Sequence, residues 1–192
     1  LDPLEHVVEV HERPATGDYY YQARHPHIAQ IVFTRILTNR DDRINEYLRI
    51  VDNLNLSYDT DRVAFRGLLR AKALHELFPS YQDVRTIFEK AEEIGSGEAY
   101  LYQQRANYER IRPDGNLQDA ERFLEHAREL DPRDESIVHT LAEVYRTRAE
   151  QAKGALVRRK VRDEARAILR PILTGADGGS DSYARVTFIK LA

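Results

Sequence analysis

Two histidines separated by a single proline are the first residues whose types could do chemistry. His25 and His27 flank Pro26, and imidazole is the commonest metal ligand in proteins. Residues two positions apart do not share a helix face, however, and neither a cysteine nor an H-E-x-x-H sequence lies nearby. We therefore predict no metal site in this chain.

Patterns for nucleophilic or phosphate chemistry are missing from the sequence. There is no cysteine, no G-x-S-x-G sequence, and no glycine-rich loop that ends in Lys and Ser or Thr. Carboxylates are plentiful, with 32 acidic residues among 192, so pairs of them arise by chance. The sequence predicts no catalytic residue and no cofactor within this chain, which we expect not to be an enzyme by itself.

A basic run near the C-terminus could bind phosphate. It reads VRRKVRDEARAILR and is interrupted by Asp163 and Glu164, which suit local ion pairs on a solvated helix face. No aromatic residues alternate with these cations, and the whole chain has a net charge of −3, so nucleic-acid binding is not favoured. The cations of the run are Arg158, Arg159, Lys160, Arg162, Arg166 and Arg170.

Composition narrows the class of protein further. The sequence lacks cysteine, which excludes disulfides, and it has no apolar run of the roughly 18 residues that a transmembrane helix needs. Its N-terminus lacks the basic and then apolar order of a signal peptide. We therefore predict a cytoplasmic protein that makes no membrane contact. Because the chain begins without Met and contains none, we expect it to be a piece of a longer protein.

Short β-rich runs at the N-terminus predict a hairpin. The run from His6 to Val10 and the run YYYQAR are separated by turn-forming residues that include Pro14 and Gly17. From Pro26 onward the apolar residues follow helical spacing. One helix is predicted from Val63 to Phe78, and later helices are expected to begin after the N-cap residues Asn116 and Asp134.

Paired helices recur along the chain at the spacing of a tetratricopeptide repeat. Ala91 and Ala127 lie 36 residues apart, and Ala127 and Ile172 lie 45 apart, so the last unit is longer. Small residues at such positions let neighbouring helices approach closely. The predicted fold is mainly α: a tetratricopeptide-like α-solenoid of antiparallel helix pairs with an N-terminal β-hairpin. The central unit fits the repeat best, at Gly115, Leu117, Ala120, Leu124, Ala127 and Pro132.

Such an array offers an extended groove that suits a protein or peptide better than a compact ligand. Its lining comes from first-helix faces that remain once the core positions are assigned. The candidate residues for this protein-binding groove are Gln103, Asn107, Arg110, His139 and Arg146.

The order of these elements resembles the C-terminal region of bacterial STAND-type signal-transduction NTPases. In that class a P-loop ATPase module precedes a winged-helix domain and a repeat sensor. The stretch YYYQARHPHIAQIVFTRIL is similar to the end of the winged-helix domain. The resemblance implies a first domain at residues 1–57, the end of the winged helix, and a repeat array at 58–192. It also implies a parent protein that uses ATP or ADP with Mg²⁺ and acts in bacterial antiphage defence.

The resemblance gives one residue a specific role. The class has a histidine at the start of such a helix that contacts the β-phosphate of ADP, and His25 matches it, with Arg24 beside it. Arg24 and Pro26 differ from the Met and Asp that flank this histidine in the plant form of the motif. A plain structural joint between strand and helix explains the same residues, and both interpretations stay open.

The function predicted from the sequence is protein recognition within a regulated NTPase, with a phage protein as one candidate ligand. Two alternatives remain. One is a stand-alone tetratricopeptide adaptor, and the other is a nucleic-acid-binding winged-helix protein. Whether the parent is a homo-oligomer stays open.

Overall fold

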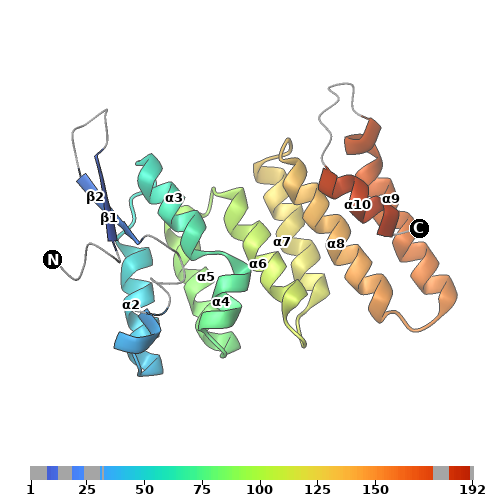
Figure 1. Cartoon of the computed structure of the whole chain (residues 1–192). Helices are drawn as coiled ribbons and strands as arrows, with labels where there is room; N and C mark the ends of the chain where they lie inside the picture. Colours follow the sequence, from blue (N-terminus) through green and yellow to red (C-terminus); the bar gives the residue numbers. More distant parts are fainter. Residues whose placement is uncertain (1–7, 13–18, 24–30, 32, 175–181, 191–192) are drawn as a thin grey trace. The chain divides into compact units, whose positions relative to one another are not determined.

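A computed structural model of the chain describes residues 8–12, 19–23, 31, 33–174 and 182–190. The described chain is mainly helical (Figure 1). It divides into two compact units, Leu1–Ile50 and Val51–Ala192. The domain boundary predicted after residue 57 lies a few residues beyond this division, in the loop that precedes Asp59.

The described part of the first unit contains two strands, a short helical stretch at residues 33–36 and most of one further helix. Strands β1 (Val8–Glu12) and β2 (Tyr19–Ala23) pair antiparallel, with Val10 opposite Tyr21. They lie where the sequence predicts a hairpin, although the connecting residues are outside the described part. Helix α2 (Arg40–Asp52) begins after Asn39, whose side-chain oxygen accepts a hydrogen bond from the Asp41 amide at 2.8 Å.

The second unit is built from helices joined by short turns. Helicity was predicted for this whole region, and the helices described here confirm it. None of the described helices combines the length and the apolar character that a bilayer crossing requires. The helices are α3 (Asp59–Leu68), α4 (Ala71–Leu77), α5 (Tyr81–Gly95), α6 (Ala99–Ile111), α7 (Leu117–Leu130), α8 (Glu135–Gln151), α9 (Ala155–Thr174) and α10 (Ser182–Lys190).

The single helix predicted from Val63 to Phe78 is wrong, because the structure has two helices there. Helix α3 ends at Leu68, and Arg70 adopts an extended ψ of 115° before α4 begins. The amide of Ala71 in this break donates to Gln104 Oε1 at 3.1 Å. A side chain 33 residues away thus satisfies an amide that a continuous helix would have bonded internally.

Two predicted helix caps are confirmed. The side-chain oxygen of Asn116 accepts hydrogen bonds from the amides of Gln118 and Asp119 at the start of α7. Asp134 does the same for Ser136 at the start of α8, at 2.8 Å. Each cap satisfies amides that have no partner inside the helix, so these two residues fix where the helices begin.

Alanines without exposed surface lie at the contacts between helices. Ala120 and Ala127, which the repeat pattern assigns to such contacts, are both fully buried on α7. The absence of a longer side chain allows neighbouring backbones to approach closely. The other fully buried alanines of these helices are Ala91 on α5, Ala106 on α6, Ala142 on α8 and Ala165 on α9.

The order of contacts within the second unit is regular. Consecutive helices pack together from α5 to α10, as the ribbon shows (Figure 1). In addition α4 contacts α6, α6 contacts α8, and α8 contacts α10. Helices α4, α6, α8 and α10 therefore form a continuous row, and we call their shared surface the even-helix face.

The turn between α6 and α7 depends on one glycine and one buried carboxylate. Glu109 is buried, and its Oε2 accepts from the Asn116 amide at 3.0 Å. The amide of Gly115 donates to Arg112 O at 3.1 Å. A Cβ at Gly115 would lie far inside contact distance of the Glu109 carbonyl oxygen, so the turn closes only around glycine.

We predict that Ala120→Leu destabilises the second unit. Extra methyl groups at a fully buried contact must displace neighbouring side chains, at a cost of roughly 1–3 kcal/mol. Urea unfolding followed by circular dichroism measures the change. Glu125→Leu, at an exposed position of the same helix, is the control. Equal unfolding midpoints for Ala120→Leu and wild type would contradict this packing.

Gly115→Ala should also destabilise the chain, by roughly 1–3 kcal/mol, because the new Cβ collides with backbone rather than with a movable side chain. Gly97→Ala is the matched control, since a Cβ there meets nothing within 4 Å. We expect that control to be neutral or stabilising by about 0.4–1 kcal/mol. Thermal unfolding of both variants tests the pair, and a Gly115→Ala protein as stable as Gly97→Ala would refute the close approach.

Candidate functional site

Four of the five predicted groove residues belong to a polar network on the even-helix face. Asn107 and Arg110 lie three residues apart on α6. His139 and Arg146 lie on the neighbouring helix α8. The first pair is three residues apart and the second is seven, and both spacings place two residues on one face of a helix, so each helix presents its pair toward one surface.

Glu143 on α8 is the centre of this network. Its Oε2 accepts hydrogen bonds from Nε and Nη2 of Arg146, at 3.1 and 3.0 Å. Its Oε1 accepts from the hydroxyl of Thr187 on α10, at 2.6 Å. Both guanidinium N–H groups thus converge on one carboxylate oxygen while Thr187 engages the other, and these charge-assisted bonds hold the carboxylate in a fixed orientation.

The bond to Thr187 fixes the proton on His139. Nε2 of His139 lies 3.0 Å from the hydroxyl oxygen of Thr187. That hydroxyl has one proton and donates it to Glu143, so it must accept from His139. Nε2 of His139 therefore bears a proton, and the order of donation runs from imidazole to hydroxyl to carboxylate.

This order of donation determines what the cluster can do. A nucleophilic hydroxyl needs a base that accepts its proton and an accessible position. Thr187 is 2% exposed, and the imidazole nitrogen that faces it is a donor. The cluster therefore favours binding and positioning over covalent chemistry.

Burial and neighbouring charges shift the pKa of the Glu143 carboxyl in opposite directions. Burial alone would raise the pKa of its carboxyl, but the hydrogen bonds from Thr187 and Arg146, with the charges of Arg146 and Arg110, bring the pKa below its ordinary value. Burial likewise tends to lower the pKa of Arg146, and Glu143 and Glu150 outweigh it and raise that pKa. The ion pair is thus stabilised in its charged form.

Arg110 has a different environment. Its Nε and Nη2 donate to the neutral amide oxygen of Asn107, at 3.3 and 3.1 Å. Burial lowers the pKa of Arg110, Glu143 partly offsets this, and the charge of Arg146 adds to the lowering. A half-buried cation whose hydrogen bonds go to an amide would gain from an anionic partner.

Gln103, the fifth predicted residue, is buried between α6 and α8. Its Nε2 donates to Ser136 Oγ and to Thr140 Oγ1, both at 3.0 Å. The side chain therefore links the two helices and is used inside the array.

The network also contains Glu143 and Thr187, two residues that sequence reasoning missed. Glu143 and Arg146 are spaced as an i, i+3 ion pair, which is a readable but common signal. Thr187 gave no signal, because its bond to Glu143 spans 44 residues of sequence. Long-range partners of this kind become visible only when the helices are placed.

The other predicted features lie elsewhere. Arg24, His25 and His27 are outside the described residues, so their roles stay predictions. Asp163 pairs with Arg159 and Arg166, and Glu164 with Lys160, which confirms local partners for the basic run. Within the described ranges, no three His, Asp or Glu side chains are grouped as metal ligands.

Comparison of the chain with protein-family models, with curated proteins and with solved structures gave no match in any of the three. The function must therefore be argued from the geometry of the site.

The lowered pKa of Glu143 predicts an acid-dependent contribution to stability. A carboxyl whose folded pKa lies below its unfolded value of about 4.3 stabilises the fold above that pH and loses this contribution as the pH falls. Glu143→Gln should therefore cost roughly 1–3 kcal/mol at pH 7 and much less at about pH 3.

Urea unfolding of wild type and Glu143→Gln across this pH range measures the effect. The control is Glu125→Gln, at an exposed position of α7. A stability difference for Glu143→Gln that stays constant between pH 7 and pH 3 would show that the charged form of Glu143 contributes nothing.

Proposed function

We propose that helices α4 to α10 form a tetratricopeptide-like array whose even-helix face binds a segment of another protein. The row of contacts α4–α6, α6–α8 and α8–α10 supports this, as do the buried alanines at repeat positions. An array of this kind presents a long surface that can follow an extended or helical peptide.

The environment of Arg110 is the observation that carries the proposal. Arg110 is a half-buried cation that donates to a neutral amide, next to a carboxylate whose Oε2 already accepts two hydrogen bonds from Arg146. An acidic side chain or a C-terminal carboxylate on a ligand would complete its hydrogen bonding. Asn107 would then select for a backbone or amide group beside that carboxylate.

The wider biological role that we propose rests on the resemblance of the chain, above all of residues 19–37 and the central repeat, to the C-terminal region of STAND-type NTPases. In this role the array is the recognition part of a nucleotide-regulated switch in bacterial antiphage defence. A stand-alone adaptor would use the same face in the same way. A P-loop module in the full-length protein would separate the two, since an adaptor needs none.

Crosslinking from the even-helix face tests the binding role. We expect a photo-reactive amino acid at position 150, an exposed glutamate of α8 that pairs with Arg146, to form covalent adducts with a polypeptide in bacterial cells. The same group at position 122, an exposed arginine on α7, should form few or none. Combining the crosslinker at 150 with Arg110→Ala should reduce the adduct by about tenfold, the effect of losing one charged hydrogen bond.

Adducts that form from position 122 as readily as from 150 would place binding on another surface. Adducts that form from 150 but are insensitive to Arg110→Ala would remove Arg110 from the proposed contact. Circular dichroism of each variant confirms that the array is folded.

A further inference from the structure

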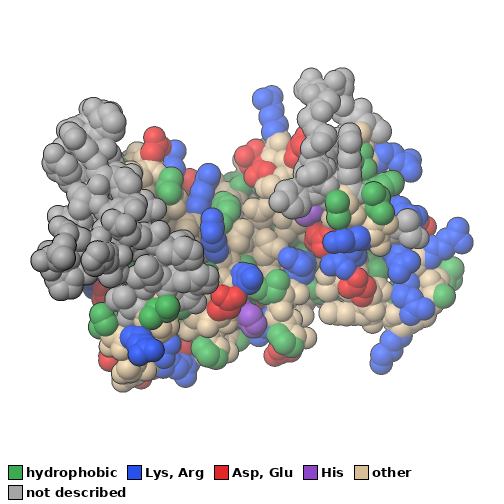
Figure 2. Space-filling view, viewed as in Figure 1, with side chains coloured by type: hydrophobic (Ala, Val, Ile, Leu, Met, Phe, Trp, Pro, Cys, Tyr) green, Lys and Arg blue, Asp and Glu red, His purple; other side chains and the backbone are tan. Residues whose placement is uncertain are grey.

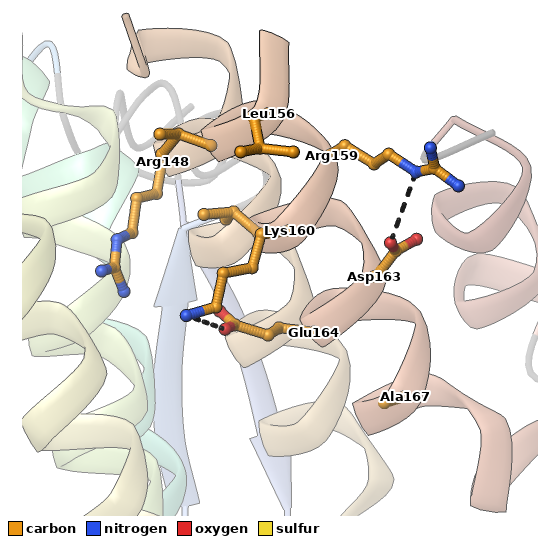
Figure 3. Close-up of a pocket in the computed structure, with 9 residues that line it drawn as sticks. Arg148, Leu156, Arg159, Lys160, Asp163, Glu164 and Ala167 are labelled. Carbon is orange, nitrogen blue, oxygen red and sulfur yellow. Dashed lines mark ion pairs between the residues drawn. The ribbon is translucent and has the colours of Figure 1, made fainter. Parts of the chain in front are cut away.

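A hollow on the surface of α8 and α9 is separate from the even-helix network (Figure 3). Val157, Val161 and Ala167 of α9 contribute apolar surface to it, and Arg148 of α8 and Lys160 of α9 lie on one side. A second hollow shares Arg148, Val157 and Val161 with the first and extends to the turn that precedes α7. The two hollows are therefore neighbours on this surface, and we call the first of them the depression.

Exposed aliphatic side chains stand at the start of α9, beside this depression. Leu156 is 82% exposed and Val157 is 51% exposed. Single exposed aliphatics are ordinary, but two adjacent ones at the edge of an apolar hollow form a contact surface that water solvates poorly. We refer to Leu156, Val157, Arg159, Lys160 and Arg148 as the α9 N-terminal surface.

Positive charge concentrates on the same segment. Residues 153–162 contain five cations and no anion, and Figure 2 shows Lys and Arg side chains gathered over the α8–α9 end of the second unit. The first turn of α9 has no acidic residue. Cations near a helix N-terminus oppose the helix dipole, so this arrangement weakens the isolated helix. An anionic partner would offset that cost.

The ion pairs on this surface are loose. Lys160 and Glu164 are 4.0 Å apart, as are Arg159 and Asp163, at the limit of contact. Figure 3 shows the two pairs on opposite sides of the hollow. The Arg159 and Lys160 side chains are about four-fifths exposed, and exposed pairs contribute little. Both cations can therefore turn toward a ligand at small cost.

We propose that the α9 N-terminal surface binds an acidic protein segment that inserts an apolar side chain beside Leu156 and Val157. The apolar hollow accommodates the inserted side chain, and the surrounding cations match acidic residues on either side of it. A flat membrane would leave a depression unfilled, and aliphatic side chains offer nucleic-acid bases no stacking surface. This surface is independent of the even-helix face, and a partner could occupy one without the other.

Selection from a random peptide library tests the proposal. The library is first depleted on a Leu156→Asp, Lys160→Glu double variant and then selected on the wild-type chain. We expect enriched peptides that combine Asp or Glu with Leu, Ile or Phe. Depletion that leaves no binder to the wild-type chain, or a pool without acidic enrichment, would overturn the proposal.

Fluorescence anisotropy with one enriched peptide then measures the contributions of the two kinds of contact. Leu156→Asp and Lys160→Glu should each weaken binding by about tenfold or more. Arg122→Glu, an exposed charge reversal on α7, should change it by less than about twofold. Equal peptide affinities for wild type and all three variants would overturn the assignment of binding to the α9 N-terminal surface. All three substituted side chains are exposed, so folding should be unaffected.

Two further probes separate other occupants. Phosphatidylserine vesicles and single-stranded DNA are tested for binding to wild type and to Leu156→Asp. Vesicle or DNA binding that Leu156→Asp weakens more than it weakens peptide binding would assign the surface to that ligand and overturn the proposal. If Leu156→Asp weakens peptide binding more than it weakens vesicle or DNA binding, the result supports an acidic protein partner.

Discussion

The second unit depends on close contact between helices that cannot bury their apolar faces alone. The contacts are made possible by alanines with no exposed surface, one or two on each helix from α5 to α9. Large side chains such as Phe88, Leu124 and Leu169 then fill the space around them and are fully buried as well. Since every helix supplies part of its neighbour's core, the stability of each depends on the next.

Close packing of this kind requires that polar groups at the contacts find partners within the array. Helix α6 meets this requirement with two consecutive glutamines. Gln104 accepts from the Ala71 amide on α4, and Gln103 donates to Ser136 on α8, each across 33 residues of sequence. Adjacent residues point about 100° apart on a helix, so the two side chains reach opposite neighbours. Helix α6 is thereby fixed to both sides of the row.

What the sequence could reveal follows from the range of each interaction. Asn116 and Asp134 were readable because a cap acts within three residues, and Ala120 and Ala127 because the apolar residues of this segment follow helical spacing. The break between α3 and α4 was not readable, since its partner Gln104 lies 33 residues ahead. The candidate site likewise has a part that the sequence could reveal and a part that it could not. Its helix faces followed from periodicity, whereas the bond that joins Glu143 to α10 arises only when distant helices meet.

The two charged surfaces of the array differ in how their charges are compensated. On the even-helix face Glu143 is largely buried and engaged by Arg146 and Thr187. Its charge is therefore compensated within the folded chain. On α9 Arg159 and Lys160 are exposed, and their carboxylate partners lie at the limit of contact. Salt screens exposed charges within a Debye length of about 8 Å under physiological conditions, and it screens buried pairs much less. Arg159 and Lys160 can thus exchange partners at little cost, whereas the network around Glu143 holds α8 and α10 together.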